Sequence, residues 1–173
     1  ARAAELLTIM VGLVALGLWW SVPSVAPLAA HNPPTSAFIE MRKAEAAAAR
    51  KPWRLQWTWR SLDEISPFMR HAVVLAEDDT FWRHDGFDLD ALEAAAQSAL
   101  EAGVEATRRG GSTITQQLAK NLYLSPDRTY VRKARELLIA MRLERDLPKA
   151  RILELYLNLA EWGDGIFGIE AAS

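Results

Sequence analysis

The sequence of 173 residues contains no cysteine and only three histidines. Absence of cysteine excludes disulfide bonds and thiolate metal ligands. The histidines, His31, His71 and His84, lie far apart in the sequence, which argues against a zinc site. The chain also lacks internal repeats, a low-complexity tail and alternating strands that would build a sheet. The absence of alternating strand patterns favours a mainly α-helical protein.

An excess of charge of one sign is also missing, because 20 Lys and Arg residues against 22 Asp and Glu residues give a net charge of −2. Between residues 106 and 135, however, seven cations accompany a single acid, Asp127. Clustered Arg and Lys side chains suit recognition of phosphate or pyrophosphate. Nucleic acid is the competing ligand, but no phenylalanine or tryptophan is interleaved with these cations and the overall balance is slightly acidic. We therefore expect no nucleic-acid partner.

One long hydrophobic segment occurs, at the N-terminus. No charged residue lies between Leu6 and Ala30, and Trp19 and Trp20 stand near the end of the apolar stretch. About 20 apolar residues cross a bilayer core, and tryptophan favours the membrane–water boundary. We predict a transmembrane anchor in residues 1–30. A cleaved signal peptide is the alternative, although this stretch is longer than the roughly 7–15 residues of a signal-peptide core.

The remaining chain shows mainly helical patterns. Pro33 and Pro34 cannot lie inside a helix and indicate a boundary loop. Residues 51–60 alternate tryptophan and leucine with polar residues, which indicates a short strand or an extended arm. We predict helices at residues 38–50, 67–76, 88–102, 113–124, 129–145 and 148–161. Apolar residues on most faces of segment 152–159 predict that Tyr156 and Asn158 are buried framework, whereas we expect Arg142 and Arg145 to lie on a solvated helix face.

The first segment whose side chains could take part in a reaction is residues 77–86. The apolar residues 71–76 predict a helix that ends at Glu77, followed directly by Asp78 and Asp79. A carboxylate that is partly desolvated and crowded by like charges has a raised pKa. A raised pKa suits a general acid or base near neutral pH. The alternative is an ordinary acidic helix end followed by a loop, and we interpret His84 as structural.

The second such segment is residues 110–121. It opens with two glycines, which permit unusual backbone angles. Thr113 and Gln116 then have the spacing of a capping box at a helix start. Such a helix end offers free N–H groups and a positive dipole, so we expect a seat for an anion. An ordinary capped turn is the alternative, but it does not explain the density of amides and hydroxyls that follows.

Four motifs in this order resemble those of the peptidoglycan glycosyltransferases, which polymerise lipid II into glycan strands. The motifs are Glu77-Asp78-x-x-Phe81-x-x-His84-x-Gly86-x-Asp88, Gly111-Ser112-Thr113-Ile114-Thr115-Gln116-Gln117-x-x-Lys120-Asn121, Arg132-Lys133-x-x-Glu136 and Ile152-Leu153-Glu154-Leu155-Tyr156-Leu157-Asn158. The resemblance covers residues 63–173. Residues 162–168 are most similar to the monofunctional, membrane-anchored branch of the family.

The resemblance implies a lysozyme-like domain of two lobes with a cleft between them, in residues 61–173. A linker and arm in residues 31–60 would join this domain to the anchor. The family's fold continues beyond the position of Ser173, so we expect the C-terminal helices of one lobe to be missing and the activity of this chain to be weak or absent. The family also implies a place in the bacterial inner membrane, with the catalytic domain on the extracytoplasmic side.

The resemblance further implies partners and roles. The partners are lipid II, the growing lipid-linked strand and proteins of cell-wall synthesis or division. Glu77 would be the catalytic base and Glu136 the second essential acid, although Glu136 also has the spacing of a surface ion-pair partner of Arg132. Substrate-binding residues would be Ser112, Thr113, Gln116, Gln117, Lys120, Asn121, Arg128, Arg132 and Lys133. Among them, Lys120 and Arg128 fall at diphosphate-binding positions. We assign no resident metal, but a divalent cation such as Mg²⁺ or Mn²⁺ could accompany the pyrophosphate.

Two other functions fit parts of the pattern. A lysozyme-like glycan hydrolase or lytic transglycosylase also works with a single glutamate, but its substrate has no pyrophosphate and gives no use to Lys120 and Arg128. A catalytically impaired, membrane-anchored scaffold is the second alternative. The presence of Glu77, Lys120 and Glu136 argues against it.

Overall fold

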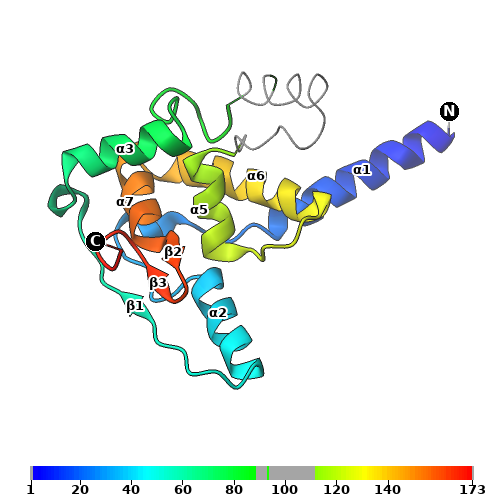
Figure 1. The fold of residues 1–173 in the computed structure, drawn as a ribbon. Helices are drawn as coiled ribbons and strands as arrows, with labels where there is room; N and C mark the ends of the chain where they lie inside the picture. Colours follow the sequence, from blue (N-terminus) through cyan, green and yellow to red (C-terminus); the bar gives the residue numbers. More distant parts are fainter. Residues whose placement is uncertain (1, 89–92, 94–111, 173) are drawn as a thin grey trace.

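The computed structural model describes residues 2–88, 93 and 112–172. As predicted, it is mainly helical (Figure 1). The helices are α1 (Arg2–Trp20), α2 (Ala37–Ala48), α3 (Pro67–Glu77), α5 (Ile114–Tyr123), α6 (Tyr130–Asp146) and α7 (Lys149–Leu159). Short 3₁₀ turns lie at Ala26–Ala29 and Leu62–Glu64. The helix predicted for residues 88–102 falls outside the described residues, and the two-lobed arrangement stays a prediction.

Local sequence explains where several helices begin. Helix α3 starts with Pro67, whose fixed φ and missing N–H suit the first helical position. The side chains of Ser36, Thr113 and Thr129 cap α2, α5 and α6 by accepting a hydrogen bond from a backbone N–H three residues later. These caps satisfy N–H groups that have no partner inside the helix.

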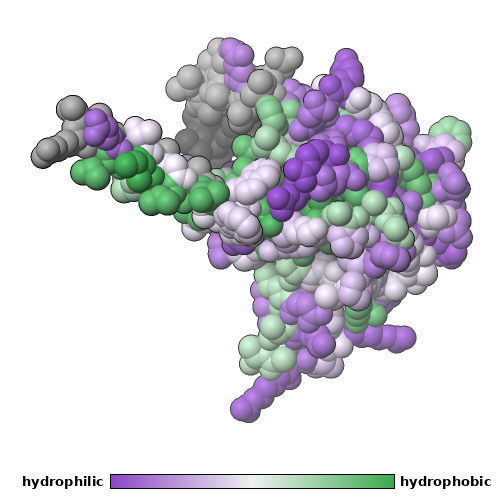
Figure 2. Space-filling view, turned by 180° about the vertical axis from the view of Figure 1, so that it is seen from behind, coloured by the Kyte–Doolittle hydropathy of each residue, from purple (hydrophilic) through white to green (hydrophobic). Residues whose placement is uncertain are grey.

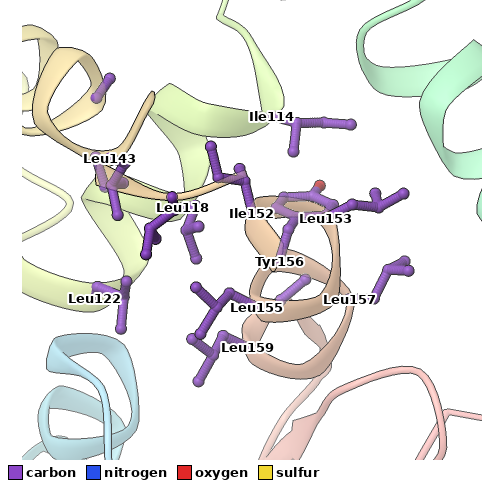
Figure 3. Packing of buried hydrophobic residues seen from close by; sticks show 14 of the residues in the cluster. Ile114, Leu118, Leu122, Leu143, Ile152, Leu153, Leu155, Tyr156, Leu157 and Leu159 are labelled. Atoms are coloured by element: carbon purple, nitrogen blue, oxygen red, sulfur yellow. The ribbon is translucent and has the colours of Figure 1, made fainter. Parts of the chain in front are cut away.

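Helix α7 lies at the centre of the hydrophobic core. Its residues Ile152, Leu155, Leu157 and Leu159 are fully buried, and Figure 3 shows them together with Leu118 of α5. A helix that is apolar on most faces must be surrounded by other elements. The burial predicted for Tyr156 and Asn158 is confirmed, since their residues are 5% and 0% exposed.

Buried Asn158 connects α7 to the arm. Its Nδ2 donates to the carbonyl oxygen of Arg60 at 2.8 Å, and its Oδ1 accepts from the N–H of Arg60 at 2.8 Å. The indole N–H of Trp57 donates to the backbone oxygen of Asn158 at 2.8 Å. A buried amide is tolerated because its donors and acceptors are satisfied.

A small sheet corrects the expectation that the chain builds none. Strand β1 (Gln56–Trp57) pairs in parallel with β3 (Ile166–Phe167), and β2 (Glu161–Gly163) pairs with β3 in antiparallel orientation. Strand β1 lies within residues 51–60, the segment predicted as a short strand or an extended arm. Strands β2 and β3 contain only three and two residues, so they are too short for an alternating pattern. The end of the helix predicted for residues 148–161 is also wrong, because α7 stops at Leu159 and Glu161 belongs to β2.

Helix α1 projects from the rest of the protein, and Figure 2 shows apolar side chains along it. Its exposed residues include Leu6, Ile9, Leu13 and Leu16. Among the described residues, no helix combines the length and apolar character that crossing a bilayer requires. The anchor in residues 1–30 therefore stays a prediction.

Two arginines attach the segment after α1 to the body of the protein. The Arg142 guanidinium donates to the carbonyl oxygens of Val22 at 2.9 Å and Pro23 at 3.3 Å, and it stacks over the ring of Trp19. Arg151 donates to the carbonyl oxygen of Leu28 at 2.8 Å. The prediction that Arg142 lies on a solvated helix face is therefore wrong. A periodic helix pattern cannot show that a distant segment of the chain covers one face of the helix.

We predict that Gly168→Ala destabilises the protein. Gly168 has φ +79°, and an added Cβ would lie 2.8 Å from the backbone oxygen of Asn158. The backbone conformation alone costs an alanine about 1–2 kcal/mol, and the clash adds to this. Denaturant unfolding measures the change. Gly163→Ala is the control, because its Cβ would meet only side-chain atoms of Ile166, the nearest being Cδ1 at 3.3 Å. Equal stability of the two variants would contradict the prediction.

Candidate active site

Glu77 is the last residue of α3, and the end of α3 meets the start of α5 (Figure 1). The Nε2 atom of Gln117 donates to Oε2 of Glu77 at 3.0 Å. Glu77 itself is exposed, so the partial burial expected from its apolar helix is not observed. Leu75 and Ala76 are exposed as well, because α3 buries only Val73 and Val74.

Asp78 turns into the protein, unlike its neighbour Glu77. Its residue is 9% exposed, and its Oδ2 accepts from the N–H of Ile114 at 2.9 Å and contacts Nε2 of His84 at 2.9 Å. The Nδ1 atom of His84 accepts from the N–H of Gly86 at 3.0 Å. An imidazole that accepts at Nδ1 carries its proton on Nε2 and donates to Asp78. These contacts agree with the structural role predicted for His84.

The anion seat predicted at the start of α5 is filled by the protein itself. Asp78 takes the N–H of Ile114, and the Thr113 hydroxyl oxygen accepts from the N–H of Gln116 at 3.2 Å. A carboxylate in this position also complements the positive end of the helix dipole. Only half of the predicted capping box forms, because the Gln116 side chain contacts Lys133 instead.

Glu136 is a buried carboxylate that holds two cations. Its residue is 2% exposed. One of its oxygens accepts from Nη1 of Arg132 and the other from Nζ of Lys133. The Lys133 ammonium also donates to Ser112 Oγ at 3.0 Å and to Gln116 Oε1 at 2.9 Å. A surface ion pair, the alternative considered for Glu136, is excluded by this burial. Lys133 thus joins the start of α6 to the start of α5.

The other predicted binding residues lie at different depths. Lys120 follows Gln117 by three residues on α5, which places both on one side of the helix. The Lys120 ammonium lies 5.5 Å from the centre of the Phe38 ring in α2. Asn121 is buried, whereas Arg128 is exposed in the connection between α5 and α6.

The structure brings most of the predicted site residues together around the start of α5. Glu77 contacts Gln117, and Lys133 contacts Ser112 and Gln116. A carboxylate from α3 and an ammonium from α6 therefore contact successive residues of α5, Gln117 and Gln116. Such a pair can accept a proton on one side and stabilise developing negative charge on the other.

The described residues do not form a metal site of their own. In this part of the chain, no group of three or more histidine or carboxylate side chains is placed to hold a metal ion. Both oxygens of Glu136 are already paired with cations.

Sequence reasoning missed one part of this site. The Tyr156 hydroxyl reaches Oε1 of Gln117 at 3.2 Å, although the apolar pattern of α7 indicated only a framework role. A tyrosine in a helix predicted to be buried was the one indication of this contact, because buried tyrosine hydroxyls usually find a hydrogen-bond partner.

Comparison with known proteins shows the family of this chain. Residues 42–173 match the family described as Transglycosylase. The chain belongs to this transglycosylase family. A biosynthetic peptidoglycan transglycosylase of Alcanivorax borkumensis is 45% identical over 172 residues, which cover 99% of this chain and 66% of that protein.

Two further relatives carry the same name. The biosynthetic peptidoglycan transglycosylase of Aromatoleum aromaticum is 44% identical over 171 residues, or 99% of this chain and 74% of the relative. That of Thiobacillus denitrificans is 42% identical over 173 residues, or 100% of this chain and 70% of the relative. The chain thus spans about two thirds to three quarters of the length of these relatives.

We predict that Asp78→Ala destabilises the junction of α3 and α5. The change leaves the buried N–H of Ile114 without its acceptor, which costs about 1–3 kcal/mol. Thermal or urea unfolding of Asp78→Ala and of a control variant measures the change in the free energy of unfolding. Asp79→Ala is the control, because Asp79 is exposed and should change stability by no more than about 0.5 kcal/mol. Similar losses in both variants would show that Asp78 has no special role.

Proposed function

We propose that the protein polymerises lipid II into glycan strands. The 4-hydroxyl of one sugar attacks the anomeric carbon of the growing strand, and the bond from that carbon to the lipid pyrophosphate breaks with inversion. The proposal rests on two hydrogen bonds to adjacent residues of α5. Glu77 accepts from Gln117, and the cation Lys133 donates to Gln116. The family membership and the names of the relatives support it.

Glu77 is the proposed base. Its Oε2 is held by Gln117, and among the described residues no hydrogen bond reaches its Oε1. An exposed carboxylate with one oxygen held and the other available can accept the proton of a sugar hydroxyl.

The cations are the proposed pyrophosphate site. Lys133 and Arg132 are held in place by the buried Glu136, while Lys120 lies on α5 and Arg128 in the loop that follows. Preorganised positive charge favours departure of a pyrophosphate because negative charge develops on it in the transition state. Ser112, Thr113, Gln116, Gln117 and Asn121 complete the proposed substrate-binding set. Glu136 acts in this proposal by holding the cations.

The proposal includes a location. Residues 1–30 would attach the enzyme to the bacterial inner membrane, with residues 61–173 on the extracytoplasmic side. The exposed apolar side chains of α1 support this placement. The lipid-linked substrate would then meet the enzyme at the membrane surface.

We expect Glu77→Gln to abolish polymerisation, because the amide cannot accept the proton. Loss of a general base lowers the rate by roughly 10²–10⁴-fold. Fluorescent lipid II is the substrate, and gel analysis of the glycan strands gives the rate. Asp79→Asn, which removes the neighbouring exposed charge, should leave the rate unchanged. Normal turnover in Glu77→Gln would remove Glu77 from the base role. Release of glycan from purified cell wall, without polymerisation, would instead support the hydrolase.

Lys120→Ala should weaken capture of the substrate while the fold is retained. Removal of one charge-assisted contact costs about 1.5–3 kcal/mol, so we expect KM for lipid II to rise by at least about tenfold. Lys43→Ala on the exposed face of α2 is the control and should leave KM unchanged. The proposed role of Lys120 is wrong if the two variants have the same KM.

A further inference from the structure

The side chain of Gln117 is bonded at both ends. Its Nε2 donates to Oε2 of Glu77 at 3.0 Å, and its Oε1 lies 3.2 Å from the Tyr156 hydroxyl. An amide oxygen only accepts hydrogen bonds, so the hydroxyl must be the donor. The three side chains therefore form a chain of hydrogen bonds from buried α7, through α5, to the end of α3.

The donor in this chain is well placed to keep its proton. Tyr156 is 5% exposed. Burial raises the pKa of the Tyr156 hydroxyl above its ordinary value, and the negative charges of Glu77 and Asp78 raise it further. The hydroxyl thus stays a donor over the pH range in which an enzyme works.

An amide can turn by 180° and exchange its oxygen and nitrogen. If Gln117 turned, its oxygen would face the carboxylate of Glu77, and two acceptors would repel each other. A turned amide could still donate an N–H to the Tyr156 oxygen, but the hydroxyl proton would then lose its acceptor, the amide oxygen of Gln117. The Glu77 carboxylate, which only accepts, and the Tyr156 hydroxyl, which keeps an acceptor for its proton, therefore both favour the orientation in which the amide N–H reaches Glu77.

We propose that Tyr156 is a positioning residue for the base Glu77 and acts through Gln117. The link fixes one carboxylate oxygen in place and favours the ionised form of Glu77, because a hydrogen bond donated to a carboxylate stabilises its charge. This inference rests on the proposed function for the catalytic role of Glu77, whereas the link itself can be tested without activity.

Removal of the Tyr156 hydroxyl should change the pH dependence of the rate, and the direction of this change depends on the groups that surround Glu77. Asp78 and Asp79 follow it in the chain, and the charged groups of the neighbouring helices are Lys120 on α5 and Lys133 on α6. Tyr156 on α7 acts through the Gln117 amide. Removing the Tyr156 hydroxyl weakens support of the carboxylate, so the pKa of Glu77 rises. A base works only when ionised, so the acid limb of the rate profile moves to higher pH.

The test is Tyr156→Phe, which keeps the ring and removes only the hydroxyl. We expect kcat for lipid II polymerisation to fall by about 5- to 10-fold, the equivalent of one hydrogen bond, with KM unchanged. The acid limb of the kcat profile should move to higher pH. Tyr123→Phe on α5 is the matched control and should change neither kcat nor the pH profile. If Tyr156→Phe lowers only the fraction of correctly folded, active enzyme and the acid limb does not move, Tyr156 has a merely structural role and the proposal is overturned.

A second variant approaches the same link from the other side. Gln117→Leu removes both hydrogen bonds of the amide, and we expect a loss of kcat at least as large as in Tyr156→Phe. In the double variant, the second change should add little, because both act through one link. Fully additive losses would overturn the proposal. This cycle also serves if Tyr156→Phe proves poorly folded, since Gln117→Leu alone must then reproduce the movement of the acid limb.

A measurement without substrate separates this inference from the proposed function. Carbon-13 NMR titration of the Glu77 carboxyl should show a higher pKa in Tyr156→Phe than in the unchanged protein or in Tyr123→Phe. An unchanged Glu77 titration would overturn the positioning role even if polymerisation is confirmed. A raised pKa in a protein that does not polymerise lipid II would support the link and contradict the proposed function.

Discussion

The arrangement of the site depends on one buried carboxylate, Asp78. It accepts from the first N–H of α5 and from His84, and so it joins the end of α3 to the start of α5. Because Asp78 turns inward, the adjacent Glu77 at the helix end faces outward. A change of direction between two successive acids thus separates a structural carboxylate, satisfied by the protein, from one available for chemistry.

A second buried carboxylate organises the positive charge. Glu136 pairs with Arg132 and Lys133, two cations that would otherwise repel each other at the start of α6. Burial of an unpaired carboxylate is costly, whereas one with two charged donors is tolerated. The Lys133 ammonium then contacts Ser112 and Gln116, which brings α6 against α5. The same interactions that stabilise the helix pair also hold Lys133 against α5, the helix whose Gln117 contacts the proposed base.

Much of the helical framework could be predicted, because helix starts and apolar periodicity are local properties. The caps Thr113 and Thr129 and the buried face of α7 illustrate this. The small sheet could not be predicted, since its pairing joins β1 to β3 across about 110 residues. The role of Arg142 depends on the path of the segment near Val22, which no local pattern specifies. The N-terminal stretch was predicted as an anchor, and the structure describes it as a helix without testing its membrane role.

The sequence by itself determined which chemical groups are present, their order in the motifs and the helices that carry them, because helix formation follows from neighbouring residues. Family membership was also readable from the motifs and agrees with the comparisons. Only the tertiary structure decided that Glu77 is exposed, that Asp78 fills the expected anion seat and that Tyr156 reaches Gln117. These features depend on contacts between residues 36 to 40 positions apart, and such contacts arise only when α3, α5 and α7 pack together.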